Sequence, residues 1–247
     1  GIMVARGDLG VELPVQAVPP IQKQLVRKCR AAAKPVIVAT QMLESMIESP
    51  MPTRAEVSDV ANSIYEGTDA IMLSAESAAG LFPIEAVTTM NNVAIEVERD
   101  PTYTAILEAS RSVQGKSVAD SIVAAAREIA ETTDVKAIAC FTSSGTTASL
   151  TARERPRVPI IALTANISTA RRLSLTWGTN CVITGPVDRF KTAVVAAVRA
   201  AVSQGFAEEC DQITVTAGVP FNQAGTTNIL RVAPCEERLI FRSEPDI

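Results

Sequence analysis

Short apolar runs alternate with longer amphipathic stretches over the first hundred residues. Three of these runs, rich in Val and Ile, end at a constant spacing in a polar turn: Gly1–Ala5, Pro35–Ala39 and Asp69–Leu73. A stretch with helical periodicity follows each one, at Val15–Ala33, Thr53–Tyr65 and Pro83–Val97. Short runs that are apolar on both faces are typical of covered parallel strands. The pattern therefore predicts three successive β/α units.

A second α/β module is expected after a break in this pattern. Residues 99–116 are expected to form a linker between a first domain at 1–98 and a second at 117–247. The second domain opens with a helix at Ser117–Glu131, where Asp120 stands at the third position of a capping box. Its expected strands are Lys136–Phe141, Val158–Leu163, Cys181–Thr184, Gln212–Thr216 and Asn228–Val232. Its other expected helices are Thr146–Arg155, Thr169–Thr176 and Phe190–Gln204, and Glu236–Ile247 shows no clear pattern.

Serial β/α units fit two architectures, a (β/α)₈ barrel and a doubly wound sheet. In both, the residues that follow each strand form the ligand-binding edge. Three units cannot close a barrel whose tilt and shear need eight strands. We therefore expect the first three units to be part of a larger domain that begins before Gly1.

Composition narrows the possible functions. The net charge is −4, and no block of Lys or Arg offers a surface for nucleic acid. The apolar runs are too short to cross a bilayer and no secretion signal opens the chain, so a cytoplasmic protein without membrane contact is expected. Five widely spaced cysteines without a C-x-x-C pair predict buried free thiols. Histidine is absent, so proton transfer must use carboxylates, lysine, hydroxyls or water.

Polar residues follow each of the first three strands. Asp8 lies between two glycines after the first strand, and its carboxylate could face a hard cation. Thr40 and Ser74 follow the second and third strands, where a hydroxyl could bind phosphate or pass a proton. The plainer alternative is that Gly and Asp only shape a turn and that the hydroxyls only cap one. Taken one at a time, these residues leave both interpretations open.

Taken together, three segments resemble pyruvate kinase in order and spacing. They read GIMVARGDLG over residues 1–10, VATQMLESM over 38–46 and PTRAEVSDVAN over 52–62. The resemblance extends over essentially the whole chain and is strongest over residues 1–97. It implies an α/β protein: a partial TIM (β/α)₈ barrel, followed by a smaller α/β domain with a mostly parallel five-stranded sheet.

The resemblance also implies an activity and a set of site residues. The parent enzyme would transfer a phosphoryl group from phosphoenolpyruvate to ADP in glycolysis, giving pyruvate and ATP. Asp8 would be a ligand of Mg²⁺ or Mn²⁺, the amides of Gly7 and Asp8 would hold the substrate carboxylate, and Thr40 would contact the substrate near the proton path, with Ser74 as a second catalytic hydroxyl. The family's phosphoryl-binding lysine, second metal carboxylate, K⁺ site and lid domain precede the segment at Gly1. The 247 residues alone are therefore expected to lack kinase activity.

A loop in the second domain is a candidate effector site. It consists of Thr142, Ser143, Ser144, Gly145, Thr146 and Thr147. Hydroxyls, a glycine and free helix N–H groups can bind an anion, although the same residues could simply cap the helix. The resemblance favours a loop that holds an effector phosphate. The companion loop at 218–225 lacks the arginine that many fructose bisphosphate-activated relatives carry, so we expect a monophosphate such as AMP or a sugar monophosphate.

Two rival hypotheses remain from the sequence. One is an independent, non-catalytic binding or oligomerisation module, which a natural start before Gly1 would support and an upstream reading frame would oppose. The other is a different α/β enzyme that acts on phosphoenolpyruvate, which the three consecutive matches disfavour. The resemblance further implies a homotetramer.

Overall fold

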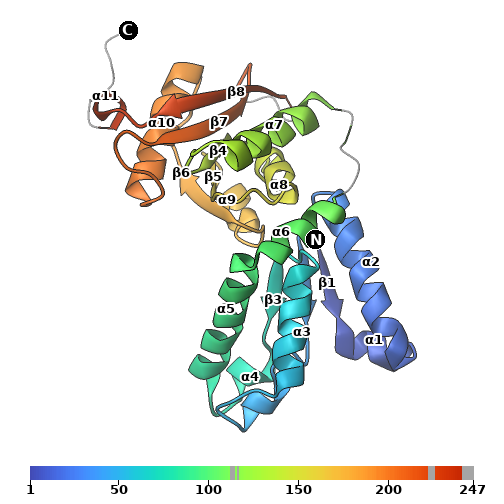
Figure 1. The fold of residues 1–247 in the computed structure, drawn as a ribbon. Coiled ribbons are helices and arrows are strands. Elements are labelled where there is room, and N and C mark those ends of the chain that lie inside the picture. The colour runs from blue at the N-terminus through green and yellow to red at the C-terminus, as the bar shows by residue number, and fades with distance from the viewer. Residues whose placement is uncertain (112–114, 116, 222–225, 241–247) are drawn as a thin grey trace. The chain divides into compact units, whose positions relative to one another are not determined.

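The computed structural model describes residues 1–111, 115, 117–221 and 226–240. It divides into two compact units, 1–113 and 114–247 (Figure 1).

The first unit contains a parallel sheet of three short strands. β1 (Ile2–Ala5), β2 (Val36–Ala39) and β3 (Ala70–Met72) lie in the order β1-β2-β3. Their register aligns Ala5 with Ala39 and Ala39 with Met72. All three strands therefore end at one edge of the sheet, and the residues that follow them are neighbours.

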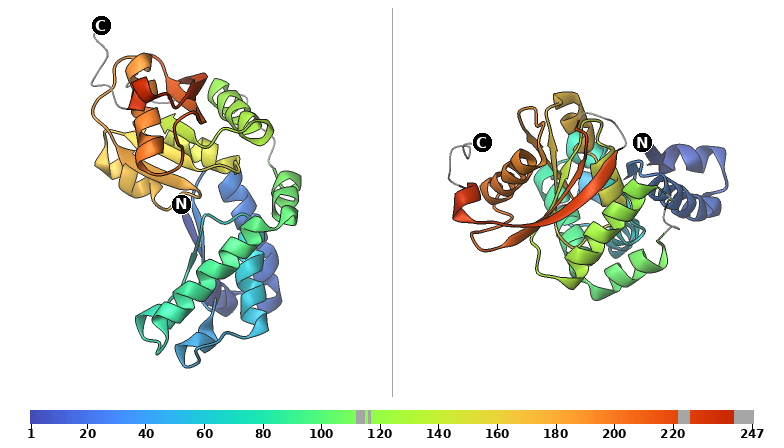
Figure 2. Two further views of the ribbon diagram at one scale, coloured as in Figure 1. Left: turned by 60° about the vertical axis from the view of Figure 1, so that its left-hand side comes forward. Right: turned by 90° about the horizontal axis from the view of Figure 1, so that it is seen from above.

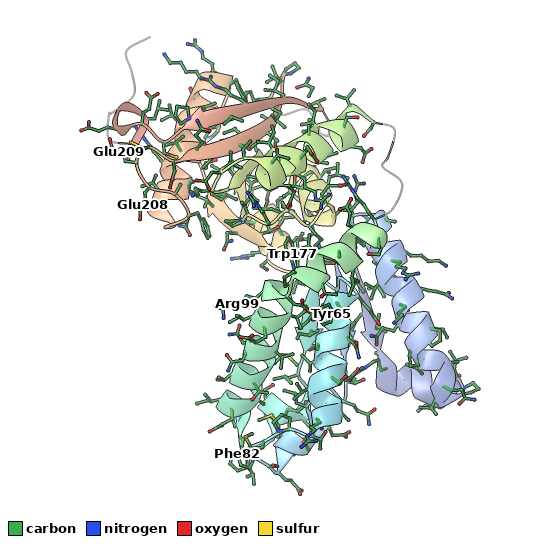
Figure 3. The ribbon with its side chains drawn as sticks, in the orientation of Figure 1. Tyr65, Phe82, Arg99, Trp177, Glu208 and Glu209 are labelled. Carbon is green, nitrogen blue, oxygen red and sulfur yellow. The ribbon has the colours of Figure 1, made fainter. Side chains whose placement is uncertain are left out.

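Helices pack on the strands through a shared apolar cluster. Val4, Val36 and Val38 contact helical side chains that include Val26, Val60 and Met90. The helices are α1 (Arg6–Glu12), α2 (Val18–Ala31), α3 (Arg54–Tyr65), α4 (Ala75–Ala78), α5 (Pro83–Arg99) and α6 (Pro101–Ala109), with 3₁₀ turns η1 (Val15–Ala17) and η2 (Glu44–Ile47). Figure 3 marks the two ends of α5 by Phe82 and Arg99. The unit consists of three successive β/α units, as the sequence pattern predicted, and its sheet does not close.

The structure differs from the expected linker at residues 99–116. Helix α6 fills part of this range, and its Tyr103 and Leu107 are buried in the core of the first unit. Arg30 on α2 donates hydrogen bonds to the Leu107 carbonyl at 3.2 Å and to the Ser110 hydroxyl at 2.9 Å. The Tyr65 hydroxyl donates to Asp100, the N-cap of α6, at 2.5 Å, and Figure 3 labels Tyr65 on α3. The sequence pattern did not predict α6 because its apolar face has only two buried positions and lies among polar residues near Pro101.

The second unit is a three-layer α/β domain. Its sheet has the order β6-β5-β4-β7-β8, in which only the β7–β8 pair is antiparallel. The strands are β4 (Ile138–Phe141), β5 (Ile160–Thr164), β6 (Thr179–Ile183), β7 (Gln212–Gly218) and β8 (Thr227–Pro234). The predicted strands are confirmed apart from shifts at their ends.

Alternate side chains of this sheet enter two different cores. Ile138 and Cys140 face α7 (Val118–Thr132) and α8 (Thr146–Arg153). Ala139 and Phe141 face α10 (Phe190–Ser203) on the opposite side (Figure 2). The remaining helices are α9 (Ile167–Leu173) and α11 (Glu237–Ile240). The capping box at the start of α7 is present, with Ser117 and Asp120 bonded reciprocally.

The cysteines agree only partly with the expected buried free thiols. All five cysteines are free; Cys29, Cys140 and Cys235 are buried, whereas Cys181 is half-buried and Cys210 is exposed. Burial raises the pKa of Cys235 to about 11. Among the described residues, no helix combines the length and apolarity that a bilayer crossing requires.

If α6 is part of the first core, truncating its buried face must destabilise that unit. We expect Leu107→Ala to lower the free energy of unfolding by about 2–4 kcal/mol, because a buried leucine leaves a cavity. The matched control is Ile106→Ala, whose side chain is 39% exposed and should cost less than about 1 kcal/mol. Urea denaturation followed by circular dichroism measures both. Equal, small effects would mean that α6 is only a connecting segment.

Candidate functional site

The edge where β1, β2 and β3 end brings Gly7 and Thr40, two of the predicted active-site residues, into contact. The Gly7 N–H donates to the Thr40 hydroxyl at 2.9 Å, which joins the turn after β1 to the turn after β2. Arg6, Gly7 and Gln41 also line a cavity of about 750 Å³. The expected turn after β1 is instead the first turn of α1, and the Gly7 amide that was expected to be free for a substrate carboxylate is bonded to Thr40. A carboxylate would have to displace that hydroxyl or use the neighbouring amide.

Arg6 holds the backbone that carries Thr40. Its guanidinium donates to the Thr40 carbonyl at 2.7 Å and to the Gln41 carbonyl at 3.1 Å. The same group forms an ion pair with Asp59 on α3 at 2.6 Å. Thr40 and Gln41 both have positive φ, 72° and 53°, a conformation that non-glycine residues rarely adopt. Such strain persists only where surrounding contacts hold it, and Arg6 supplies those contacts.

Ser74 is tied to the turn after β2 through a buried carboxylate. Glu76, in the first turn of α4, accepts a hydrogen bond from the Ser74 N–H at 2.7 Å and another from the Leu43 N–H at 3.2 Å. The Glu76 residue is only 2% exposed. The three turns that follow the strands are therefore connected by Arg6 on one side and Glu76 on the other.

A second carboxylate fixes the far end of the segment after β2. Glu56 completes the capping box of α3 with Thr53 and also accepts from the Ser45 N–H at 2.7 Å and the Ser45 hydroxyl at 2.6 Å. Burial by itself would raise the pKa of Glu56, but the hydrogen bonds from Ser45 and Thr53 together outweigh burial and lower it. The carboxylate is therefore ionised at neutral pH and holds this segment against α3.

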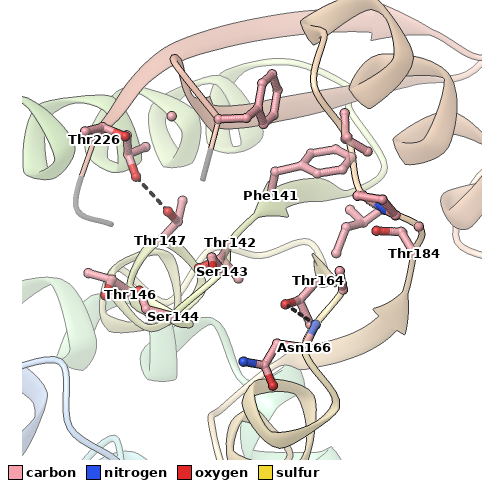
Figure 4. A pocket seen from close by; sticks show the side chains of 18 of the residues that line it. Phe141, Thr142, Ser143, Ser144, Thr146, Thr147, Thr164, Asn166, Thr184 and Thr226 are labelled. Carbon is pink, nitrogen blue, oxygen red and sulfur yellow. Dashed lines mark hydrogen bonds between the residues drawn. The ribbon is translucent and has the colours of Figure 1, made fainter. Parts of the chain in front are cut away.

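The second unit contains a cavity of about 520 Å³ at the carboxyl ends of its parallel strands (Figure 4). Its lining comes from the turns after β4, β5, β6 and β7, and includes Thr142, Ser143, Ser144, Thr146 and Thr147 of the predicted effector loop. This position is where doubly wound sheets bind ligands, because the chain reverses its winding direction there. The predicted effector loop therefore lies at the ligand-binding edge of the sheet, and its role stays a prediction.

Hydroxyl groups organise the effector loop. Thr142 Oγ1 accepts from the Gly145 N–H at 2.8 Å, and the hydroxyls of Ser144 and Thr146 lie 2.9 Å apart. Thr147 bonds to Thr227 at the start of β8, at 2.6 Å (Figure 4). Gly145 is the N-cap of α8 at φ 89°, so the first N–H groups of α8 open toward the loop.

The described lining of this cavity is uncharged. It adds hydroxyl and amide groups from the turns after β5 and β6, and an apolar wall: Thr164, Asn166, Ser168 and Thr184, with Phe141, Leu163, Pro186, Val187 and Phe221. The lining itself offers a phosphate hydroxyls and helix N–H groups, and Arg172, which donates to the Ser144 carbonyl, is a cation beside the loop.

Comparison with known proteins decides the family. The family model "Pyruvate kinase, barrel domain" matches residues 1–87, and "Pyruvate kinase, alpha/beta domain" matches residues 120–233. The chain belongs to the pyruvate kinase family. Pyruvate kinases of Methylorubrum extorquens and Agrobacterium vitis are each 52% identical to it, over 94% of this chain and 49% of their own length. A solved pyruvate kinase from Cryptosporidium parvum is 37% identical with a TM-score of 0.86, over 95% of this chain and 47% of that one.

These comparisons confirm the family and the fold class that the sequence indicated: part of a pyruvate kinase barrel followed by its α/β domain. The chain spans about half the length of the curated relatives it matches. The roles assigned to Gly7, Asp8, Thr40, Ser74 and the effector loop remain predictions.

The pyruvate kinase family implies a divalent cation, and Asp8 is the residue expected to hold it. Asp8 is exposed in the first turn of α1, and a carboxylate oxygen suits a hard cation. Within the described part of the chain, however, no group of three or more acidic or sulfur side chains could hold a metal ion. The residues present therefore fit one ligand of such a site and not the whole site.

The sequence analysis missed the residues that organise the edge where β1, β2 and β3 end. Arg6 and Asp59 lie inside the matching motifs, but their pairing across 53 positions has no sequence signal. Glu76 lies two residues after the predicted site residue Ser74, and only its burial distinguishes it. The sequence analysis also missed the cavity residues that follow β5 and β6. It predicted these two strands but assigned no function to the turns after them.

The left-handed geometry of Gly145 leads to a stability prediction. Gly145→Ala should lower the free energy of unfolding by about 1–2 kcal/mol, because an L-residue is disfavoured at positive φ. An added Cβ would also lie 3.3 Å from Leu173. Gly185→Ala, in the same cavity but with open space around the site of the new Cβ, is the control and should be tolerated. Thermal unfolding of the 247-residue chain measures both variants. Equal stability of the two variants would contradict the left-handed conformation of Gly145.

Proposed function

We propose that this chain forms the carboxy-terminal half of a pyruvate kinase, which transfers a phosphoryl group from phosphoenolpyruvate to ADP. The observation that carries the proposal is the 2.9 Å hydrogen bond from the Gly7 N–H to the Thr40 hydroxyl. It joins, at one edge of the sheet, two residues that the family resemblance assigns to substrate binding. The proposed reaction belongs to glycolysis in the cytoplasm, and the assembled enzyme is a homotetramer.

The residues of this chain have separate roles in the proposed reaction. The substrate carboxylate binds at the start of α1, at the Asp8 amide and, once it displaces the Thr40 hydroxyl, at the Gly7 amide. When phosphoryl transfer leaves the enolate of pyruvate, its methylene carbon takes up a proton, and the hydroxyls of Thr40 and Ser74 supply the path from solvent. Arg6 keeps Thr40 in place throughout.

The cofactors enter this proposal in a limited way. Asp8 is one ligand of Mg²⁺ or Mn²⁺, and the remaining ligands come from the substrate or from elsewhere in the barrel. The cation, when bound, stabilises the negative charge that develops on the enolate oxygen. We assign no residue of this chain to K⁺.

The cavity of the second unit is proposed to bind a phosphorylated allosteric effector. The hydroxyls of the 142–147 loop and the first N–H groups of α8 would hold one phosphate. Since the described lining carries no cation for a second phosphate, a monophosphate such as AMP or a sugar monophosphate is the proposed effector. A non-catalytic binding module remains the second candidate function, favoured by the fact that this cavity is more complete than the metal site.

The catalytic proposal predicts a dependence on Asp8 in the full-length enzyme. Asp8→Asn should lower kcat by at least about 100-fold, the scale of losing one electrostatic contact to developing charge. Glu12→Gln is the control, since Glu12 is an exposed acid on the same helix. A lactate dehydrogenase-coupled assay measures pyruvate formation. The 247 residues alone should give no signal, and turnover by them, or full activity of the Asp8 variant, would contradict the proposal.

The effector proposal predicts selective binding to the isolated 247-residue chain. AMP or a sugar monophosphate should bind more tightly than fructose 1,6-bisphosphate in isothermal calorimetry. Thr146→Val should weaken that binding about 10-fold by removing a hydroxyl from the phosphate loop. Thr132→Val, which removes an exposed hydroxyl bonded to the Glu128 carbonyl on α7, is the control. Tighter binding of the bisphosphate would count against a monophosphate site.

A further inference from the structure

Helix α9 is bonded to the effector loop by two side chains that lie outside the cavity lining. The Thr169 hydroxyl, on a residue that is 2% exposed, donates to the Ser143 carbonyl at 2.9 Å. Three positions later, on the same face of the helix, the Arg172 guanidinium donates to the Ser144 carbonyl. Two successive carbonyls of the loop are therefore held by one helix, and nothing in the proposed function uses this contact.

The bond from Thr169 fixes the direction of one peptide group of the loop. In a trans peptide, the C=O and the N–H point in opposite directions. Since the Ser143 carbonyl faces the Thr169 hydroxyl, the Ser144 N–H of the same peptide group points away from that hydroxyl. Among the described residues, no group accepts a hydrogen bond from the Ser144 N–H. This bond therefore leaves a backbone donor of the loop unoccupied.

The bond from Arg172 begins a chain of hydrogen bonds that ends at a hydroxyl of the cavity. The Ser144 carbonyl belongs to the same peptide group as the Gly145 N–H, which donates to Thr142 Oγ1 at 2.8 Å. Thr142 Oγ1 is thereby an acceptor, and its own proton has no acceptor within the described part of the chain. Successive hydrogen bonds polarise one another, so the cation at the start makes this O–H a stronger donor. Thr142 lines the cavity (Figure 4).

The charge of Arg172 is available to the loop. The residue is exposed, and no described carboxylate forms an ion pair with it. A contact that only fastened α9 to the loop would be served by a neutral donor, as at Thr169. A cation does more, because a charge-assisted hydrogen bond is about twice as strong as a neutral one. It thereby opposes rotation of the peptide group, which would turn the negative end of the carbonyl dipole toward a bound anion.

We propose that Thr169 and Arg172 are positioning residues of the effector site. They hold the carbonyls of Ser143 and Ser144 toward α9, and so leave the Ser144 N–H and the Thr142 O–H to bind a phosphate. The ligand class is a phosphate monoester or inorganic phosphate, since both present the same oxygens to these donors. This inference rests on the proposed effector site.

The test is an NMR titration of the isotope-labelled 247-residue chain with inorganic phosphate at constant ionic strength. In the wild type, the amide signals of residues 143–147 should shift and saturate. Arg172→Met should raise the Kd about 10-fold, the scale of losing one hydrogen bond to a charged group. The matched control is Arg171→Met, which removes the same charge from an exposed position of the same helix. It should change the Kd by less than about 2-fold.

Further variants separate positioning from packing. Arg172→Lys keeps a charged donor, so its phosphate affinity should lie between those of the wild type and Arg172→Met. Thr169→Val removes the hydroxyl at nearly constant shape, whereas Thr169→Ser retains it, so only the valine variant should weaken binding. Without phosphate, the Gly145 amide proton of Arg172→Met should move upfield relative to Arg171→Met, because its hydrogen bond to Thr142 loses polarisation. A contact with a merely structural role would leave that resonance unchanged.

Wild-type affinity in Arg172→Met, or equal weakening in Arg171→Met, would overturn the inference. Should Thr169→Val fail to fold, Arg172→Met still decides the question, because removing an exposed side chain leaves no cavity. The two proposals fail differently. A wild-type chain whose loop signals do not respond to phosphate refutes the effector site and this inference with it, whereas a responsive wild type with an unaffected Arg172→Met refutes only the role of α9.

Discussion

The Arg6 guanidinium is the interaction on which the candidate active-site edge depends. It donates to two successive carbonyls at the place where the backbone after β2 enters the left-handed region, and it pairs with Asp59 on α3. Two such residues cost about 1–2 kcal/mol each, so this conformation requires strong compensating contacts. Charge-assisted hydrogen bonds from a planar group with fixed donors are well suited to that task. One side chain thereby orients β1, β2 and α3 around Thr40.

The two units create their sites by different physical means. In the first unit, the buried or half-buried side chains of Arg6, Glu56 and Glu76 form hydrogen bonds with backbone groups. These bonds favour a rigid arrangement of the turns that follow the strands. In the second, hydroxyls and helix N–H groups surround a cavity whose described lining carries no charge. Rigid placement suits a proton path, because small displacements of reacting groups are costly. For the proposed effector phosphate, neutral hydrogen-bond donors suit reversible binding, because they hold an anion less strongly than ion pairs do.

Several parts of the fold could be predicted because their signals are local. The strands β2, β4 and β5 are apolar on both faces and stand between clear turns, and Ser117 with Asp120 forms a capping box within four residues. Helix α6 was hidden because it has only two buried side chains, Tyr103 and Leu107, among polar neighbours. Helix α1 was taken as a turn because Gly7 and Gly10 are poor helix formers, and the tertiary contacts of Arg6 and Gly7 override that preference.

The amino-acid sequence alone determined the order of the β/α units, the family, and the residue types available at each strand end, because periodicity and motif spacing are properties of neighbouring positions. Only the tertiary structure decided which of those residues meet. The Arg6–Asp59, Gly7–Thr40 and Glu76–Leu43 contacts join segments 33 to 53 positions apart, and they depend on strand order and register. Such contacts leave no periodic trace in the chain, because parallel pairing brings distant strand ends to one edge whatever residues lie between them.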